Sequence, residues 1–223
     1  MKKFLIKGFL FVSIFLFISN ILALPSYSSE IIQEADSANF SVFKKDFKKV
    51  LLKANIDVFD KHFSGLIFIK YITKDSTMRI VFLSEVGLKI FDLGFYLYQN
   101  NFSKENFTIH YCLGQLNKKA LIKTIKNDFD LILMNNLIVS KLKRLEDKKK
   151  DFFLWKYKNK NQKNLYFQNI ETGNISKIIS KKGLFRKVSI ELLHYKEGFP
   201  EKIFIAHRNM KLNIELIKVK NPE

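Results

Sequence analysis

The sequence predicts an α+β fold in which helices cover the concave side of one large, curved antiparallel sheet. Its apolar patterns follow one another as a helix, about four strands, a second helix and about six strands. Turn residues, not helices, separate most of the strand-like runs, which favours antiparallel neighbours. A sheet of about ten strands curls strongly, so helices lying across it would enclose an apolar concavity.

The chain begins with a stretch typical of an export signal, over residues 1–29. Lysines precede an apolar run over 8–24, and a proline with small residues follows it. We expect a cut between Leu24 and Glu30, with an uncleaved N-terminal anchor as the alternative, because the run nearly reaches spanning length. Either reading places the remainder outside the cytoplasm, as a single domain over 30–223.

The mature part is strongly basic. The formal net charge is +18, and removing the three lysines of the leader lowers it to +15. An exported basic protein meets anionic membrane surfaces more often than nucleic acid. Only four of the 39 basic residues are arginine, the residue that bidentate phosphate recognition favours. The predicted partner surface is therefore an anionic membrane, and no nucleic acid is expected.

The elements follow from periodicity. Three- and four-residue steps from Phe40 through Phe43 and Phe47 to Ala54 predict an amphipathic helix over 40–54. A helical period returns over 116–136, and a charged connector spans 141–150. Strands rich in β-branched and aromatic residues are predicted over 63–72, 78–83, 88–98, 107–113, 152–157, 164–170, 175–180, 187–194, 202–207 and 211–219.

No recognised catalytic or metal motif is present. The four histidines match no zinc spacing, and the glycine motifs of hydrolases and nucleotide-binding proteins are missing. We expect the acid pair Asp128/Asp130 to be solvated on a helix surface. The sequence therefore predicts a protein that is not an enzyme, without cofactor or metal. A hydrolase using Cys112 or Ser84 is a remaining alternative, although the partner that would orient a base is missing.

The segment Arg79–Leu93, with Phe63–Gly65 before it and Tyr111–Lys118 after it, resembles small envelope proteins of Bacteroidetes-type bacteria. Those proteins are similar to the lipoprotein carrier and receptor family (LolA/LolB-like). The resemblance implies a half-barrel sheet whose helix-covered cavity holds acyl chains. It also implies that Arg79 is the counterpart of the carrier's arginine beneath the lid helices. The receptor branch's lipid-anchored cysteine has no equivalent after this leader.

These observations predict a periplasmic or outer-membrane-associated protein that binds acyl chains or lipoproteins in an aromatic-lined cavity. Arg79 is the predicted latch that holds the helix over 40–54 closed as a lid. An interaction module with a solid core and a basic docking face is the alternative, and the size of the cavity separates the two. The predicted cavity wall consists of Phe68, Ile80, Phe82, Phe91, Phe95, Ile109 and Phe129.

Overall fold

The computed structural model describes residues 40–44, 46–97, 106–114, 119–135, 137, 141–145, 151–159, 162–183 and 185–220. The leader predicted over 1–29 lies outside these residues. The described residues form a single twelve-stranded antiparallel sheet with one α-helix, α2, packed against it.

The strands are numbered in the order in which they follow one another along the chain. A short 3-10 turn, η1 (Thr73–Asp75), lies between β2 and β3, and α2 (Lys119–Leu133) lies between β5 and β6. Their bounds are β1 (Lys49–Val58), β2 (Lys61–Ile72), β3 (Thr77–Ser84), β4 (Lys89–Tyr96), β5 (Phe107–Cys112), β6 (Lys143–Leu145), β7 (Phe152–Asn159), β8 (Gln162–Asn169), β9 (Ile175–Lys182), β10 (Phe185–Lys196), β11 (Phe199–His207) and β12 (Leu212–Lys218).

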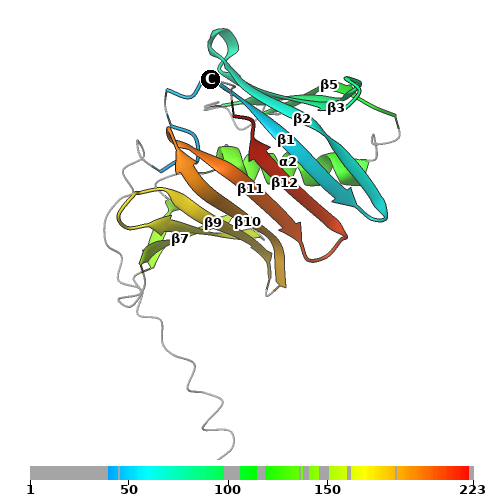
Figure 1. Cartoon of the computed structure of the whole chain (residues 1–223). Helices are drawn as coiled ribbons and strands as arrows, with labels where there is room; N and C mark the ends of the chain where they lie inside the picture. The colour runs from blue at the N-terminus through cyan, green and yellow to red at the C-terminus, as the bar shows by residue number, and fades with distance from the viewer. Residues whose placement is uncertain are drawn as a thin grey trace, which may run out of the picture. The chain divides into compact units, whose positions relative to one another are not determined.

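Two meanders make up the sheet. Strands β1 to β5 form one and β6 to β12 form the other, and the pairing of β1 with β12 joins them in the middle. In that pairing Ala54 lies opposite Leu216. Figure 1 shows β1 beside β12, with α2 behind them. Because β5 and β6 are the two edges of the sheet, α2 lies in the connection between opposite edges.

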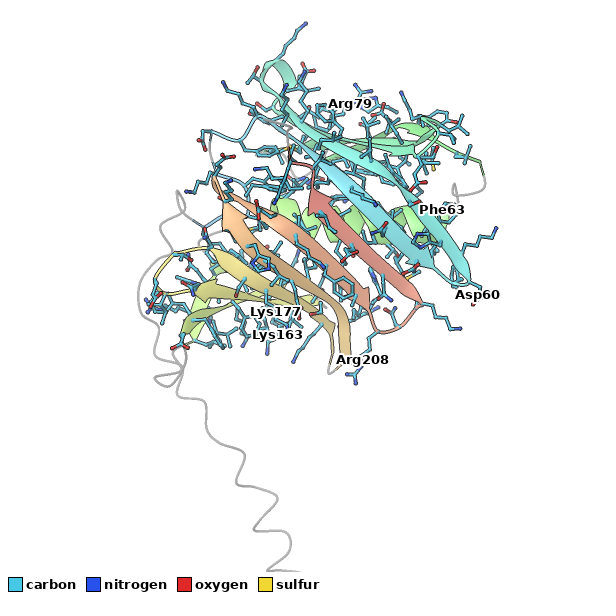
Figure 2. The ribbon with its side chains drawn as sticks, in the orientation of Figure 1. Asp60, Phe63, Arg79, Lys163, Lys177 and Arg208 are labelled. Carbon is cyan, nitrogen blue, oxygen red and sulfur yellow. The ribbon has the colours of Figure 1, made fainter. Side chains whose placement is uncertain are left out.

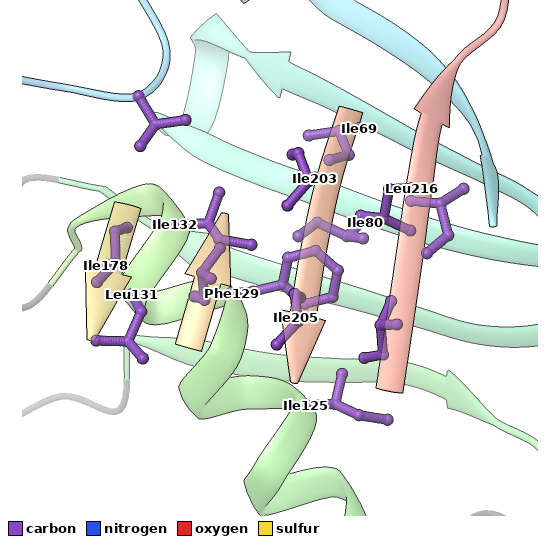
Figure 3. Close-up of a cluster of buried hydrophobic side chains, with 14 of the residues drawn as sticks. Ile69, Ile80, Ile125, Phe129, Leu131, Ile132, Ile178, Ile203, Ile205 and Leu216 are labelled. Atoms are coloured by element: carbon purple, nitrogen blue, oxygen red, sulfur yellow. The ribbon is translucent and has the colours of Figure 1, made fainter. Parts of the chain in front are cut away.

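Alternation places the core on one face of the sheet, which we call the inner face. Along β1, alternate residues from Val50 to Val58 are buried and those between them are exposed or half-buried. Helix α2 packs on this face, where Phe129 and Ile132 lie among Ile80, Ile203 and Leu216 (Figure 3). The opposite face, which we call the outer face, carries most of the lysines of these strands.

The prediction of an α+β fold with helices covering the concave side is wrong. In the described part of the chain one α-helix accompanies twelve strands, so the architecture is almost entirely an antiparallel sheet. The lid helix predicted over 40–54 is absent: residues 40–44 and 46–48 are irregular, and β1 begins at Lys49. The apolar residues of this segment also fit a period of two, and strands on both sides of β1 impose that reading.

The second predicted helix is present as α2, and a strand lies at each of the ten predicted strand positions. Strand β6 lies within the segment predicted to be a charged connector, where Lys143–Leu145 adds a short edge to β7. No helix in the described residues is both long enough and apolar enough to cross a membrane.

Candidate functional site

A small apolar cavity lies between α2 and the inner face of the sheet. Its volume is about 30 Å³, and every side chain that lines it is apolar. A cavity of this size holds one or two water molecules, whereas pockets for small ligands measure roughly 300–1,000 Å³. The lining residues are Ile56, Val58, Phe63, Ile67, Phe82, Phe91, Leu121, Ile125, Phe129, Leu212 and Ile214.

Helix α2 contributes one stripe to this cavity. Leu121, Ile125 and Phe129 recur every four residues and therefore lie on the same side of the helix. Aromatic contacts connect this stripe with the sheet: the rings of Phe95 and Phe129 are 6.1 Å apart between centroids. The rings of Phe82 and Phe91, on neighbouring strands, are 5.4 Å apart.

The structure brings three of the seven predicted wall residues to the cavity, namely Phe82, Phe91 and Phe129. Two more, Ile80 and Phe95, are fully buried in the same hydrophobic core. The remaining two, Phe68 and Ile109, do not line the cavity. Phe68 is on the outer face, because its neighbours Ile67 and Ile69 take the inner positions of β2. Ile109 is on the edge strand β5 and is 44% exposed.

Sequence reasoning missed the other eight lining residues. Ile56 and Val58 belong to β1, whose N-terminal half was assigned to a helix. The alternation of apolar residues from Val50 to Val58 was the sequence signal that could have found them. Leu212 and Ile214 reach the cavity because β12 pairs with β1. That pairing joins segments far apart in the sequence, and no local pattern reveals it.

Arg79 lies on the outer face, on the other side of the sheet from α2. Its guanidinium donates two hydrogen bonds to Asp92 on the neighbouring strand, Nε to Oδ1 at 2.7 Å and Nη2 to Oδ2 at 2.9 Å. These bonds hold the pKa of the Asp92 carboxyl below its usual range. Arg79 therefore connects β3 to β4. The segment that it was predicted to latch as a lid helix is irregular over residues 40–44 and 46–48 and continues as strand β1.

A buried histidine–carboxylate pair fastens α2 to the C-terminal part of the sheet. His207 at the end of β11 and Asp128 of α2 are 3.0 Å apart between Nε2 and Oδ1, with side chains 2% and 1% exposed. His207 Nδ1 donates to the carbonyl oxygen of Leu212 at 3.1 Å, which leaves Nε2 facing the carboxyl group of Asp128. Burial raises the pKa of Asp128.

The expectation that Asp128 and Asp130 are solvated is therefore wrong, because both are buried. Asp130 accepts a hydrogen bond from Lys126 one turn earlier, at 2.6 Å. The helical period of α2 could have predicted the burial of both carboxylates, because Asp128 and Asp130 flank Phe129, which faces the sheet.

Neither proposed nucleophile has a base beside it in the described residues. The Cys112 thiol is half-buried, contacts the carbonyl of Leu113, and has its pKa raised by burial, which favours the unreactive thiol. The Ser84 hydroxyl accepts a hydrogen bond from the backbone N–H of Leu88. The described residues also contain no group of three or more potential metal-ligating side chains close enough to hold an ion.

Comparison with known proteins gives a distant structural likeness. No family model matches the chain, and no curated protein sequence matches it. A crystal structure from Vibrio parahaemolyticus, provisionally described as an outer membrane lipoprotein-sorting protein domain, is similar with a TM-score of 0.46 and 7% sequence identity. The match covers 79% of this chain and 85% of that chain. At this level it assigns no function.

Proposed function

We propose that this protein is a non-enzymatic envelope protein that binds acyl chains, free or as part of a lipoprotein, between α2 and the inner face of the sheet. The observation that supports the proposal is the cavity itself, which is lined on the sheet side and the helix side by apolar residues alone. Such a lining recognises a ligand by burial of apolar surface and offers no group for chemistry.

Binding requires α2 to move. A cavity of about 30 Å³ excludes an acyl chain, so the packed arrangement is the ligand-free state. Withdrawal of α2 exposes the stripe of Leu121, Ile125 and Phe129 together with the sheet residues beneath it. A bound acyl chain would cover both surfaces again and recover about 25 cal/mol for each Å² of apolar area removed from water.

The proposal is tested by placing a charge in the helix stripe. Leu121 lines the cavity and is half-buried, so a longer polar side chain there still reaches solvent. We expect Leu121→Glu to weaken binding of a fluorescent fatty acid at least about tenfold, because a carboxylate beside an apolar ligand loses hydration. Asn127→Glu adds the same charge to the exposed side of α2 and should change the affinity less than about twofold.

Circular dichroism of both variants confirms that each is folded, and hydrogen exchange of residues 119–133 reports the movement of α2. The proposal fails if Leu121→Glu binds as tightly as the unmodified chain. It also fails if the unmodified chain binds no fatty acid. The protein would then be the alternative, an interaction module whose core is filled by its own side chains.

A further inference from the structure

Five lysines gather on the outer face of β6, β7, β8 and β9, and we call this group the lysine surface. Lys158, Lys163 and Lys181 lie directly opposite one another across β7, β8 and β9. Lys156 lies two residues before Lys158 on the same face and pairs with Lys143 of β6. Neighbouring strands are about 4.8 Å apart, so the positive charges of these lysines lie close to one another on the outer face.

Among the described residues, none of the five lysines forms an ion pair with an acidic side chain, whereas Lys177 on the same face pairs with Glu191 at 2.7 Å. Figure 2 labels Lys163 and Lys177, on the adjacent strands β8 and β9. Burial, together with the charges of Lys156, Lys181 and Lys158, lowers the pKa of Lys163.

Protection of a sheet edge does not account for this arrangement. Lysines on edge strands prevent pairing with other chains, but Lys163 and Lys181 belong to the interior strands β8 and β9. Like charges directly opposite each other in a sheet oppose folding. A row of three such lysines is therefore better explained by an anionic partner than by the stability of the fold.

Apolar side chains continue the same face beyond the lysines. Leu154 and Phe167 are cross-strand neighbours on the outer face, and the ring of Phe152 packs against Phe167 with centroids 5.0 Å apart. These three side chains are half-buried. A basic group beside partly exposed aromatic and aliphatic side chains matches the interface of an anionic bilayer, which offers phosphates and the start of the acyl region.

The geometry points to the lysine surface as a docking site for an anionic phospholipid bilayer. Lysine suits this partner because its long apolar stem lies along the sheet while its point charge reaches the phosphates. The lysine surface is on the opposite face of the sheet from α2 and its cavity, so this docking goes beyond acyl-chain binding and does not depend on it.

The test compares the full chain with two triple variants on vesicles. Lys156→Gln/Lys163→Gln/Lys181→Gln removes three charges from the lysine surface. A control removes three charges from exposed lysines of separate elements, Lys74→Gln/Lys123→Gln/Lys196→Gln. Each protein is sedimented with phosphatidylcholine vesicles that contain phosphatidylglycerol and with vesicles of phosphatidylcholine alone. The ratio of the two partition coefficients removes the contribution of the apolar leader.

We expect the unmodified chain to prefer phosphatidylglycerol, with a preference that weakens as salt is added. The lysine-surface variant should lose this preference by on the order of 100-fold, since each lysine near an anionic surface contributes about fivefold. The control should change it by less than about threefold. Fatty-acid binding should be the same in all three proteins, which separates this test from that of the cavity.

Three outcomes overturn the proposal. The first is no preference for phosphatidylglycerol in the unmodified chain. The second is an equal loss in both triple variants, which would show that net charge alone attracts the protein. The third is binding of a single-stranded RNA oligonucleotide through the lysine surface in preference to the vesicles, which would make the partner a nucleic acid.

Discussion

Among single residues, the ion pair of Arg79 and Asp92 shows how one side chain stabilises the outer face of the sheet. Asp92 is almost fully buried and accepts both hydrogen bonds of the guanidinium. Lys89 adds a longer contact at 3.4 Å. The carboxylate is thus kept ionised by cations on two strands.

Asp92→Asn should lower the free energy of unfolding by about 1–2 kcal/mol at pH 7, because a charge-assisted pair becomes a neutral contact and Arg79 stays partly solvated. The lowered pKa of Asp92 means that its stabilisation is present above its unfolded pKa of about 3.9 and is lost as the pH falls through the folded value. Urea unfolding over an acid pH series should therefore show the variant and the unmodified chain converging.

A constant difference at every pH would contradict this role of the carboxylate. Asp57→Asn is the matched control, because Asp57 contacts His62 in an exposed pair. It should change the free energy of unfolding by less than about 0.5 kcal/mol.

At the scale of residues, the sequence indicated several aromatic residues of the cavity wall but not the face of the sheet on which each side chain lies. Phe82, Phe91 and Phe129 were recognisable as apolar residues of strands and a helix. Phe68 was misplaced because β2 is apolar on both faces, and a shift of one residue moves a side chain to the other face. Arg79 was misplaced for a related reason: its partner Asp92 becomes a neighbour only through the pairing of β3 with β4.

Among the elements, α2 depends on its buried polar contact as well as on its apolar stripe. The pair of Asp128 and His207 is out of solvent, and within the described part of the chain Asp128 Oδ2 has no hydrogen-bond partner. Removing the carboxylate leaves His207 with an unsatisfied nitrogen inside the protein.

Asp128→Ala should therefore cost about 1–3 kcal/mol in the free energy of unfolding and accelerate hydrogen exchange in residues 119–133. Asp128→Asn should cost clearly less. Its amide can donate to Nε2 of a neutral His207 whose Nδ1–H still donates to Leu212. Urea unfolding and exchange mass spectrometry measure both effects. Equal losses in the two variants would show that the hydrogen bond has no part in holding α2.

The segment predicted as a helix over 40–54 shows why the type of an element can be missed from the sequence. Phe40, Phe43 and Phe47 follow helical spacing, yet Phe40 packs edge-on against Trp155 and Tyr166, and Phe43 and Phe47 contact Phe199. These partners lie far away in the chain, and their contacts hold residues 40–44 and 46–48 in an irregular conformation. Helix α2 was predictable from its own residues, because its apolar residues recur on one side of the helix along its length.

For the whole molecule, the decisive contact is the pairing of β1 with β12. Each meander could form from local hairpins, but only this pairing makes one sheet and one core out of the two. Most hairpins were predictable from turn residues, but those of β1 with β2 and of β6 with β7 were not, because β1 and β6 were not predicted as strands. The order of the strands was not predictable either, because it depends on segments from the two ends of the described chain.

A chain that ends at Asn209 should fail to form a soluble monomer. The loss of β12 leaves the long strands β1 and β11 as neighbouring unpaired edges and removes Leu212, Ile214 and Leu216 from the core. Size-exclusion chromatography with light scattering should show aggregates. A chain that lacks only residues 221–223, after β12, should elute like the full-length protein. A soluble monomer from the shorter chain would show that the first eleven strands fold without β12.

The path of the chain through α2 limits how it can move. One end of the helix continues from β5 and the other continues into β6, so the backbone holds it at both edges of the sheet. A helix tethered at one end could rotate outward about a single hinge, whereas the displacement of α2 is limited at both ends by its connections to β5 and β6. The length of these two connections therefore sets an upper bound on the thickness of any molecule accommodated beneath α2.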